Sequence, residues 1–274
     1  MKTIALLQVY NEEKFVRRAI LNRLPYVDKI IVSEGRLTVF GDMSMRSTDR
    51  TREIIKELAE QSSKVILLDP LDESAFDCCR SREQCEGLNK NYMLEKSGIE
   101  HGDIIHVLDA DEFYSPEGLL WIIEQFAKDD KKRQCWPEEW QFAYNLKYAF
   151  PARHGSRFLR YINGSHFGET NHFFHGDFDL VLDKSFVVPR TKSGVCHLSW
   201  VKSPALIREK VVSFNRPTFT NWFNNKYLRW VQNKGEFMNG KILVEYTKVL
   251  PKELHDYTDD FCQEVSLNWR KYLI

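Results

Sequence analysis

The stretch Asp103-Ile-Ile-His-Val-Leu-Asp-Ala-Asp-Glu112 decides the fold that this chain is expected to adopt. Its apolar run, residues 104–108, has the length of a buried strand and ends in three acids, Asp109, Asp111 and Glu112. Buried runs of this kind are typical of parallel strands, whose carboxyl ends open into the ligand-binding crevice of α/β sheets. Two carboxylates separated by one small residue can ligate Mg²⁺ or Mn²⁺ and still let a diphosphate approach. The stretch therefore predicts a metal and diphosphate site after a central strand.

An alternative interpretation is that the three acids form the N-terminal cap of the next helix. That helix has its own start signal, because Ser115 is a good cap, Pro116 suits the first turn and Glu117 follows. The acids are therefore not needed as caps.

Strands and helices alternate before this stretch. Strands are expected at 4–9, 29–33 and 65–68, and helices at about 49–61 and 81–96, with a first helix capped by Asn11. This order predicts an α/β fold of the Rossmann kind, with a mostly parallel mixed sheet flanked by helices. The G-x-G-x-x-G fingerprint is missing, so side chains and a metal would have to hold a nucleotide.

The second part of the chain has a different composition and a different pattern of apolar residues. Aromatic-rich, β-leaning segments at 140–148, 158–162 and 180–188 predict a mixed sheet extension that builds a substrate pocket, or a small β subdomain without a site. Helical patterns follow near 203–214, 221–233 and 259–272. We expect a catalytic domain at 1–202, with a nucleotide-binding half (1–112) and an acceptor half (113–202), and a C-terminal helical extension (203–274) packed on it.

Composition narrows the classes of function. Lysine plus arginine equals aspartate plus glutamate at 39 each, so no global field attracts nucleic acid or anionic lipid. The chain shows neither a signal peptide nor an apolar run of membrane-spanning length. Its 6 cysteines lack C-x-x-C spacing, which favours reduced thiols, and a cytoplasmic protein is expected.

Several short segments occur in a characteristic order. They are Leu7-Gln-Val-Tyr-Asn-Glu-Glu13, Glu34, Ser47-Thr-Asp-Arg-Thr-Arg-Glu-Ile-Ile55, Ser81-Arg-Glu-Gln84 followed by Asn89 or Asn91, Asp109-Ala-Asp111, and Gly194-Val-Cys-His-Leu-Ser-Trp200. Together they resemble the nucleotide-sugar glycosyltransferases of the GT-A fold, particularly glycosyltransferase family 2 and family 17-like enzymes. The resemblance spans about residues 3 to 215. Ser33-Glu34 replaces the paired aspartates usual in family 2, which leaves the choice of nucleoside open.

The resemblance implies a set of residues that bind the nucleotide-sugar. It assigns nucleoside contacts to Val9, Tyr10, Asn11, Glu12 and Glu34, and further donor contacts to Arg82, Asn91, Asp109, Ala110 and Asp111. Asp109 and Asp111 would hold Mn²⁺ or Mg²⁺, with His197 as a third metal or diphosphate contact. A histidine within an apolar segment is also a common core residue.

Other candidates follow from side-chain chemistry. Arginine pairs with phosphate through two hydrogen bonds, which makes Arg82, Arg157 and Arg160 candidates for the diphosphate. Trp200 is a candidate for stacking on a sugar or base. An inverting transfer needs a general base, for which we choose Glu169 first, with Asp177 and Glu112 as alternatives.

The function predicted from the sequence is metal-dependent transfer of a sugar from a nucleotide-sugar donor, UDP-linked by resemblance, to a hydroxyl acceptor with inversion. The acceptor would be a glycan, a lipid-linked glycan, a protein or a hydroxylated DNA base, which is the only role expected for nucleic acid. One alternative is a sugar nucleotidyltransferase, although its G-x-G-T-R loop is absent after the first strand. The other is a glycan-binding protein that keeps the fold without the chemistry.

Overall fold

A computed structural model describes most of the first 200 residues and parts of the rest. The described residues are 1–35, 46–69, 71–77, 79, 81–143, 145–153, 155–168, 173–175, 178–179, 185–201, 236–237, 241–242, 244–245 and 251–254. The helices predicted near 203–214, 221–233 and 259–272 lie outside these residues, as do Glu169 and Asp177.

The first half of the chain forms a parallel sheet, as predicted. Its strands are β1 (Thr3–Val9), β2 (Lys29–Glu34), β3 (Val65–Leu67) and β4 (Ile104–Leu108). They lie in the order β3-β2-β1-β4, and each neighbouring pair is parallel. Three helices connect them: α1 (Val16–Arg23), α2 (Thr51–Gln61) and α3 (Arg82–Ser97), the last preceded by a 3₁₀ turn at Glu73–Phe76.

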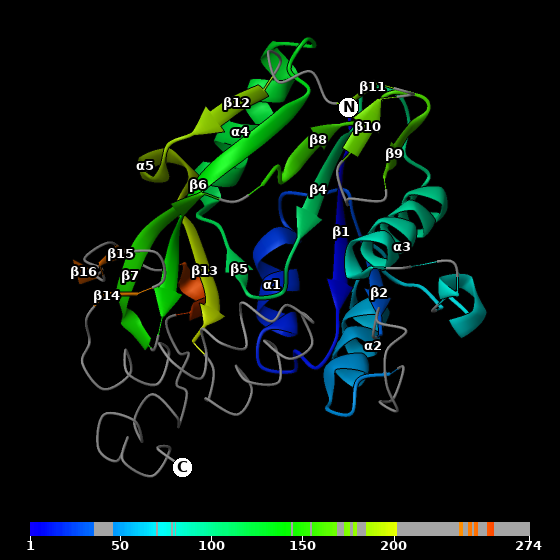
Figure 1. Cartoon of the computed structure of the whole chain (residues 1–274), viewed down its shortest axis with the longest axis horizontal. Coiled ribbons are helices and arrows are strands. Elements are labelled where there is room, and N and C mark those ends of the chain that lie inside the picture. The colour runs from blue at the N-terminus through cyan, green and yellow to red at the C-terminus, as the bar shows by residue number, and fades with distance from the viewer. Residues whose placement is uncertain are drawn as a thin grey trace.

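The helices cover both faces of this sheet (Figure 1). Because successive residues of a strand point to opposite faces, β1 contributes to two apolar clusters. Ala5 and Leu7 pack with residues of α1 and α2, whereas Ile4 and Leu6 pack with Met93 of α3. Apolar residues at consecutive positions therefore form a strand buried on both sides.

The helix expected at about 81–96 is α3, and the start signal predicted at Ser115 is confirmed at α4 (Pro116–Lys128). The Ser81 hydroxyl accepts the Gln84 backbone N–H at 3.2 Å, and Ser115 accepts that of Gly118 at 3.0 Å. Gly98 ends α3 with a φ of 65°, a backbone conformation that glycine adopts at little cost.

The predicted cap of the first helix is wrong. Helix α1 begins at Val16, and Asn11 lies before it with a φ of 52°. The Asn11 amide oxygen accepts the Thr48 backbone N–H at 2.9 Å, across to the segment before α2. Asparagine tolerates this left-handed conformation, and here its side chain joins two segments where the sequence pattern indicated a cap.

Beyond β4 the sheet becomes mixed. The added elements are β5 (Glu112–Phe113), β6 (Gln134–Ala143), β7 (Asn145–Arg153), β8 (Phe158–Arg160), β12 (Ser185–Val188), α5 (Arg190–Ser193) and β13 (Val195–Trp200). Strand β6 pairs with β7 and β8 in antiparallel fashion and with β12 and β13 in parallel. The α/β fold with a mostly parallel sheet flanked by helices is thereby confirmed.

Three short strands and a few C-terminal segments complete the described structure. β9 (Ser165–Phe167), β10 (Phe173–His175) and β11 (Phe178–Asp179) form a separate sheet next to α3. β14 (Glu236–Phe237) pairs with β15 (Lys241–Ile242), and β16 (Val244–Glu245) pairs with β7. Leu254, in a 3₁₀ turn at Lys252–Leu254, belongs to the apolar cluster that includes α1. Within the described residues, no helix is long and apolar enough to cross a membrane.

A histidine lies in the middle of the central strand. His106 has no exposed surface, stacks on Phe158 with ring centroids 4.0 Å apart, and meets the edge of Tyr114. Neither ring nitrogen has a hydrogen-bond partner among the described residues. Burial, with the charges of Arg23 and Arg157, lowers the pKa of His106 well below its usual value, against the opposing effect of Asp109. His106 is therefore neutral in the folded protein.

This burial predicts a pH-dependent stability. Below the unfolded-state pKa of about 6.5, the unfolded chain binds a proton at His106 that the folded chain does not, so stability falls as pH falls. The slope from this group is about 1.4 kcal/mol per pH unit. We expect His106→Phe, which keeps the ring stack, to lose less stability than the wild type between pH 6.5 and pH 5 in urea unfolding. Replacement of the exposed His101 by Gln is the control, and an unchanged slope in His106→Phe would contradict this account.

Candidate metal and donor site

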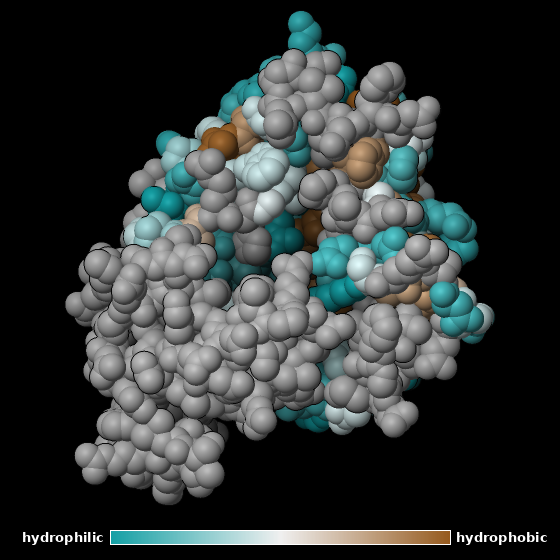
Figure 2. All heavy atoms as spheres, viewed as in Figure 1, coloured by the Kyte–Doolittle hydropathy of each residue, from teal (hydrophilic) through white to brown (hydrophobic). Residues whose placement is uncertain are grey.

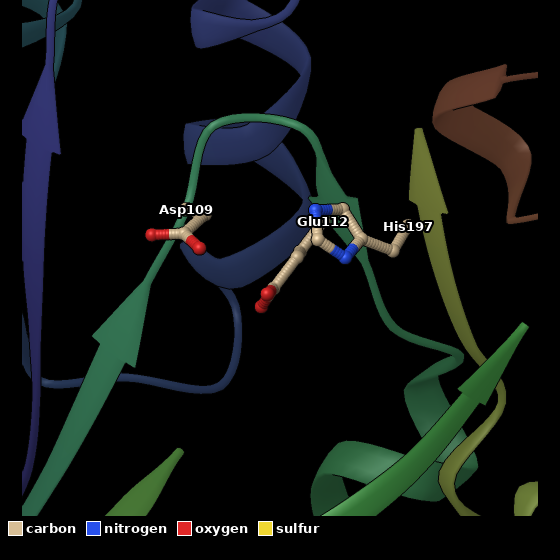
Figure 3. A group of neighbouring side chains, drawn as sticks. All are labelled: Asp109, Glu112 and His197. Carbon is tan, nitrogen blue, oxygen red and sulfur yellow. The ribbon is translucent and has the colours of Figure 1, made fainter. Parts of the chain in front are cut away.

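The acidic stretch lies where the sequence places it, directly after the central strand. Asp109 follows β4, and the chain turns so that Glu112 enters β5, which pairs antiparallel with β13. In this pairing Glu112 is the Cα partner of His197. Figure 3 shows Asp109 at the end of β4 and the ring of His197 pointing from β13 toward Glu112. Strand pairing thus brings a histidine from late in the sequence to the acids.

These side chains form a cluster suited to a divalent cation. Asp109, Glu112 and His197 each offer a ligand atom, and the three atoms lie within 4.8 Å of one another. Carboxylate and imidazole are both acceptable ligands for Mn²⁺, whereas Mg²⁺ prefers oxygen. Asp109 has the open position, with a side chain 46% exposed, and Glu112 is fully buried. The sequence pattern indicated Glu112 as one of three acids after the strand and as an alternative general base, and the structure adds it to the cluster that could hold a cation.

Asp111 lies against His197. Its Oδ1 is 3.3 Å from His197 Nε2, and its Oδ2 accepts the Ser199 hydroxyl at 3.1 Å. The Leu198 backbone N–H also donates to the Asp111 carbonyl oxygen at 2.8 Å. Of the three predicted metal ligands, Asp109 and His197 thus belong to the cluster with Glu112, whereas Asp111 contacts His197 from outside it, and the metal role of all three stays a prediction.

Arg157 supplies positive charge to the acids. One guanidinium nitrogen is 2.5 Å from Asp109 Oδ2 and also binds Glu112. Its backbone is held between strands, since its N–H donates to Cys135 and its carbonyl accepts the Val107 N–H. Burial alone would lower the pKa of Arg157, but its attraction to Asp109 and Glu112 raises the pKa above the ordinary value. Burial raises the pKa of Glu112 and Asp109 adds to the rise, whereas the guanidinium of Arg157 opposes it.

His197 lies between two carboxylates. Its Nδ1 is 3.3 Å from Glu139 Oε1 on β6, and its Nε2 faces Asp111 and the Ser199 hydroxyl, the latter at 2.5 Å. Burial would lower the pKa of His197, but the charges and hydrogen bonds of Glu139 and Asp111 raise it to about 10. His197 consequently carries positive charge at neutral pH unless a metal displaces a proton.

The residues predicted to contact the nucleoside connect the ends of β1 and β2 to the segment 46–52. The Glu34 carboxylate, fully buried, accepts the Ser47 backbone N–H at 2.7 Å and binds Arg52 at 3.1 Å. The Glu12 backbone N–H donates to Thr51 at 2.7 Å, as Asn11 does to Ser47 at 3.0 Å. Val9 is buried and Tyr10 is partly exposed. These side chains shape the crevice wall, and their contact with a nucleoside remains a prediction.

Helix α3 forms another side of the site. The Asn91 amide exchanges two hydrogen bonds with the Phe167 backbone, at 2.7 and 2.8 Å, and Arg82 forms an ion pair with Glu86 at 2.6 Å. Lys90 was not a candidate from the sequence. Burial lowers its pKa, while the nearby acids Glu86 and Asp109 oppose this and Arg157 adds to it. Lys90 is thus a further cation within electrostatic reach of Asp109.

Three other candidates, Trp200, Arg160 and Ala110, lie within the described residues. Trp200 ends β13 with 6% of its surface exposed, so most of its ring is packed. Arg160 donates to the carbonyl oxygens of Phe126 at 2.5 Å and Asp129 at 3.2 Å, at the C-terminal end of α4. Its guanidinium therefore satisfies carbonyl oxygens at the end of a helix, and these contacts give no support to a phosphate role, which stays a prediction. Ala110 is buried between the two aspartates.

The face of the molecule that carries these elements is hollowed near its middle, and hydrophilic side chains gather there (Figure 2). Several charged groups of the site would contribute to such a surface, since Asp109 is open and Lys90 and Arg82 are partly exposed. A polar hollow at the carboxyl end of a parallel sheet is the usual location of a ligand site.

Comparison with known proteins adds little to this description. No protein-family model and no curated protein matches the chain.

Three solved structures show limited similarity. The chain is similar to glucosyl-3-phosphoglycerate synthase from Mycobacterium tuberculosis, a structure in complex with Mn²⁺, UDP and glucosyl-3-phosphoglycerate. This similarity covers 53% of this chain and 46% of that chain (15% identity, TM-score 0.32). Mannose-1-phosphate geranyltransferase from Thermus thermophilus is similar over 58% and 50% (14%, TM-score 0.31). Mannose-6-phosphate isomerase from Helicobacter pylori is similar over 94% and 90% (11%, TM-score 0.33). The chain spans about half the length of the first two.

The Arg157 ion pairs predict a large effect on stability. Replacing Arg157 by Met leaves the buried Glu112 and the partly exposed Asp109 without this cation, which should destabilise the fold by roughly 3–5 kcal/mol in urea unfolding at pH 7. Adding Glu112→Gln should restore much of the loss, because a neutral amide replaces the buried acid. Arg50→Met removes a guanidinium that is 72% exposed and serves as the control. An Arg157→Met protein as stable as the control would refute the prediction.

Proposed function

We propose that this chain is a metal-dependent glycosyltransferase that moves a sugar from a nucleotide-sugar donor to a hydroxyl acceptor. The observation that carries the proposal is the cluster of Asp109, Glu112 and His197, with Asp111 beside His197, at the carboxyl end of a central parallel strand. Burying several carboxylates in one place costs stability unless they are compensated. Their concentration here therefore favours a functional role over a structural one. The resemblance of the ordered motifs to GT-A enzymes names the reaction.

The donor set fits a divalent cation. Asp109 and Asp111 would hold Mn²⁺ or Mg²⁺, with His197 favouring Mn²⁺ and Glu112 near enough to take part. A bound ion of this kind acts as a Lewis acid that stabilises the negative charge developing on the departing nucleoside diphosphate. Ala110, with its small side chain, is proposed as a further donor contact between the two aspartates.

The chain's own cations would act on the same charge. Arg157 is anchored by its backbone and its guanidinium binds Asp109. These contacts support its proposed role as a ligand of the diphosphate oxygens. Lys90 approaches from α3, and Arg82 lies in the first turn of the same helix. Positive groups fixed before the reaction stabilise the leaving group without reorganisation.

Glu34, Asn11 and Glu12 would select the nucleoside mainly by holding the segment 46–52. Their hydrogen bonds to Ser47, Thr48 and Thr51 fix that segment over the ends of β1 and β2. A UDP-linked donor is proposed from the resemblance, with Val9, Tyr10, Asn91 and Trp200 as further donor contacts.

The acceptor is proposed to lie near Glu169, the general base of an inverting transfer, with Asp177 as the alternative. Phe167 and Gly168 immediately precede Glu169 and are tied to α3: a Cβ on Gly87 would lie 2.6 Å from the Gly168 carbonyl oxygen, and Asn91 binds Phe167. Close packing of two glycines therefore brings this part of the chain to the helix that carries Lys90.

Donor binding should require both the metal and the aspartates. We expect UDP or a UDP-sugar to raise the melting temperature only with Mn²⁺ or Mg²⁺ present, because a ligand that binds the folded state stabilises it. Asp109→Asn and Asp111→Asn should abolish that shift and lower donor turnover by at least about 100-fold, in line with losing an electrostatic catalyst. Thermal unfolding and nucleotide release are the measurements.

The exposed Asp130→Asn variant is the control and should respond as the wild type does. A panel of other nucleotides run in parallel identifies the donor class. No response to any nucleotide in the presence of metal would refute the proposed function and favour a binding protein without the chemistry.

Replacing the proposed base separates binding from transfer. Glu169→Gln should lower transfer to an acceptor by about 10²–10⁴-fold and leave the metal-dependent donor shift unchanged, since general base catalysis contributes an effect of that size. Glu124→Gln, on the exposed face of α4, is the control. Near-normal turnover in Glu169→Gln would exclude Glu169, and Asp177→Asn would then be measured in the same assay.

A further inference from the structure

Glu139 is a buried acid that has no role in the proposed reaction described above. It lies on β6, where it is the Cα partner of Val195 on β13, and only 2% of its surface is exposed. Its Oε1 lies 3.3 Å from His197 Nδ1. Acids are almost never fully buried unless they are paired, so this contact accounts for the position of Glu139.

The two ring nitrogens of His197 have different surroundings. Nδ1 faces Glu139, whereas Nε2 faces Asp111 Oδ1 at 3.3 Å and the Ser199 hydroxyl. A carboxylate can only accept a hydrogen bond, so Glu139 keeps a proton on Nδ1. A neutral imidazole with Nδ1 protonated has its lone pair on Nε2, on the side of Asp111.

The distance between Nε2 and Asp111 suits two ligands of one ion. Octahedral ligands at about 2.1 Å from a metal lie about 3 Å from each other. The 3.3 Å between Nε2 and Asp111 Oδ1 is close to that spacing. Metal-binding histidines usually donate their other N–H to a carboxylate, which orients the ring.

Strand pairing fixes the backbone of His197, so that the rotation of its side chain is the main conformational freedom that remains. Its Cα is paired with Glu112 on one side and Gln141 on the other, and the Gln141 amide donates to the His197 carbonyl at 3.4 Å. Strands on both sides therefore fix where the side chain starts. The orientation of the ring is then decided by what its nitrogens meet.

We propose that Glu139 is a positioning residue that holds the Nδ1–H form and the orientation of His197, so that Nε2 binds the divalent cation together with Asp111. This inference rests on the metal site of the proposed function. It assigns a specific role to a strand, β6, that contributes no predicted ligand.

The test compares three variants of the full chain by Mn²⁺ titration without nucleotide. Glu139→Leu removes the acceptor and should weaken Mn²⁺ binding by roughly 10–100-fold, the usual effect of losing such a partner. Glu139→Gln has a side chain of the same shape that keeps an oxygen acceptor, and it should lose less Mn²⁺ affinity than Glu139→Leu. Glu138→Gln, whose parent side chain binds Arg190 at 3.6 Å, is the control and should bind as the wild type does.

A second measurement follows the His197 Nδ1–H proton by NMR. The wild type should show a slowly exchanging imidazole N–H signal that persists when diamagnetic Mg²⁺ is added, and Glu139→Leu should lack it. Disappearance of the signal on adding Mg²⁺ would show that Nδ1 is the ligand and would overturn the inference. Weaker Mn²⁺ binding with the signal retained in Glu139→Leu would also overturn it, because the loss would then have another cause.

The two proposals fail in different ways. A wild-type protein that binds Mn²⁺, with Glu139→Leu binding equally well, overturns only the role of Glu139. A wild-type protein that binds no Mn²⁺ overturns the metal site of the proposed function and this inference with it. Because Glu139→Gln preserves the shape of the side chain, it tests the ranking of affinities even if Glu139→Leu does not fold.

Discussion

The concentration of acids at the end of β4 depends on the cations that compensate it. Asp111, Glu112 and Glu139 are all nearly buried, and Asp109 stands beside them. Arg157 binds Asp109 and Glu112, and His197 lies between Asp111 and Glu139. Unpaired, these carboxylates would be expensive to remove from water. Paired, they form a compact site in which charge alternates from one strand to the next.

This alternation is a consequence of topology. Strand β5 is only two residues long, yet its pairing with β13 sets Glu112 opposite His197, and β13 in turn lies beside β6, which carries Glu139. Arg157 lies directly before β8, and its backbone is hydrogen-bonded to Val107 of β4 and Cys135 of β6. The mixed part of the sheet thus completes the site that the parallel part begins.

The parallel half contributes a different kind of support. Asn11 and Glu34 use their side chains to hold the segment 46–52, and Asn91 uses its amide to hold Phe167. Residues that resemble nucleotide contacts in motif position are therefore also the ones that fix the crevice walls. Both roles are compatible, since a wall must be rigid to select one nucleoside over another. The more exposed part of the site is then left to Asp109 and Lys90.

The sequence by itself determined the elements of the parallel half and the place of the acids. Apolar runs such as 104–108 and caps such as Ser115 act over a few residues, so a local pattern reveals them. The predicted cap of α1 at Asn11 is wrong because the Asn11 side chain bonds to Thr48, a residue far along the chain. Only the tertiary structure brought Glu139, Lys90 and Ser199 to the site and set Glu112 opposite His197. Their positions follow from strand register and helix packing between distant segments, and burial then shifts the pKa values of Glu112 and Lys90, neither of which a local pattern encodes.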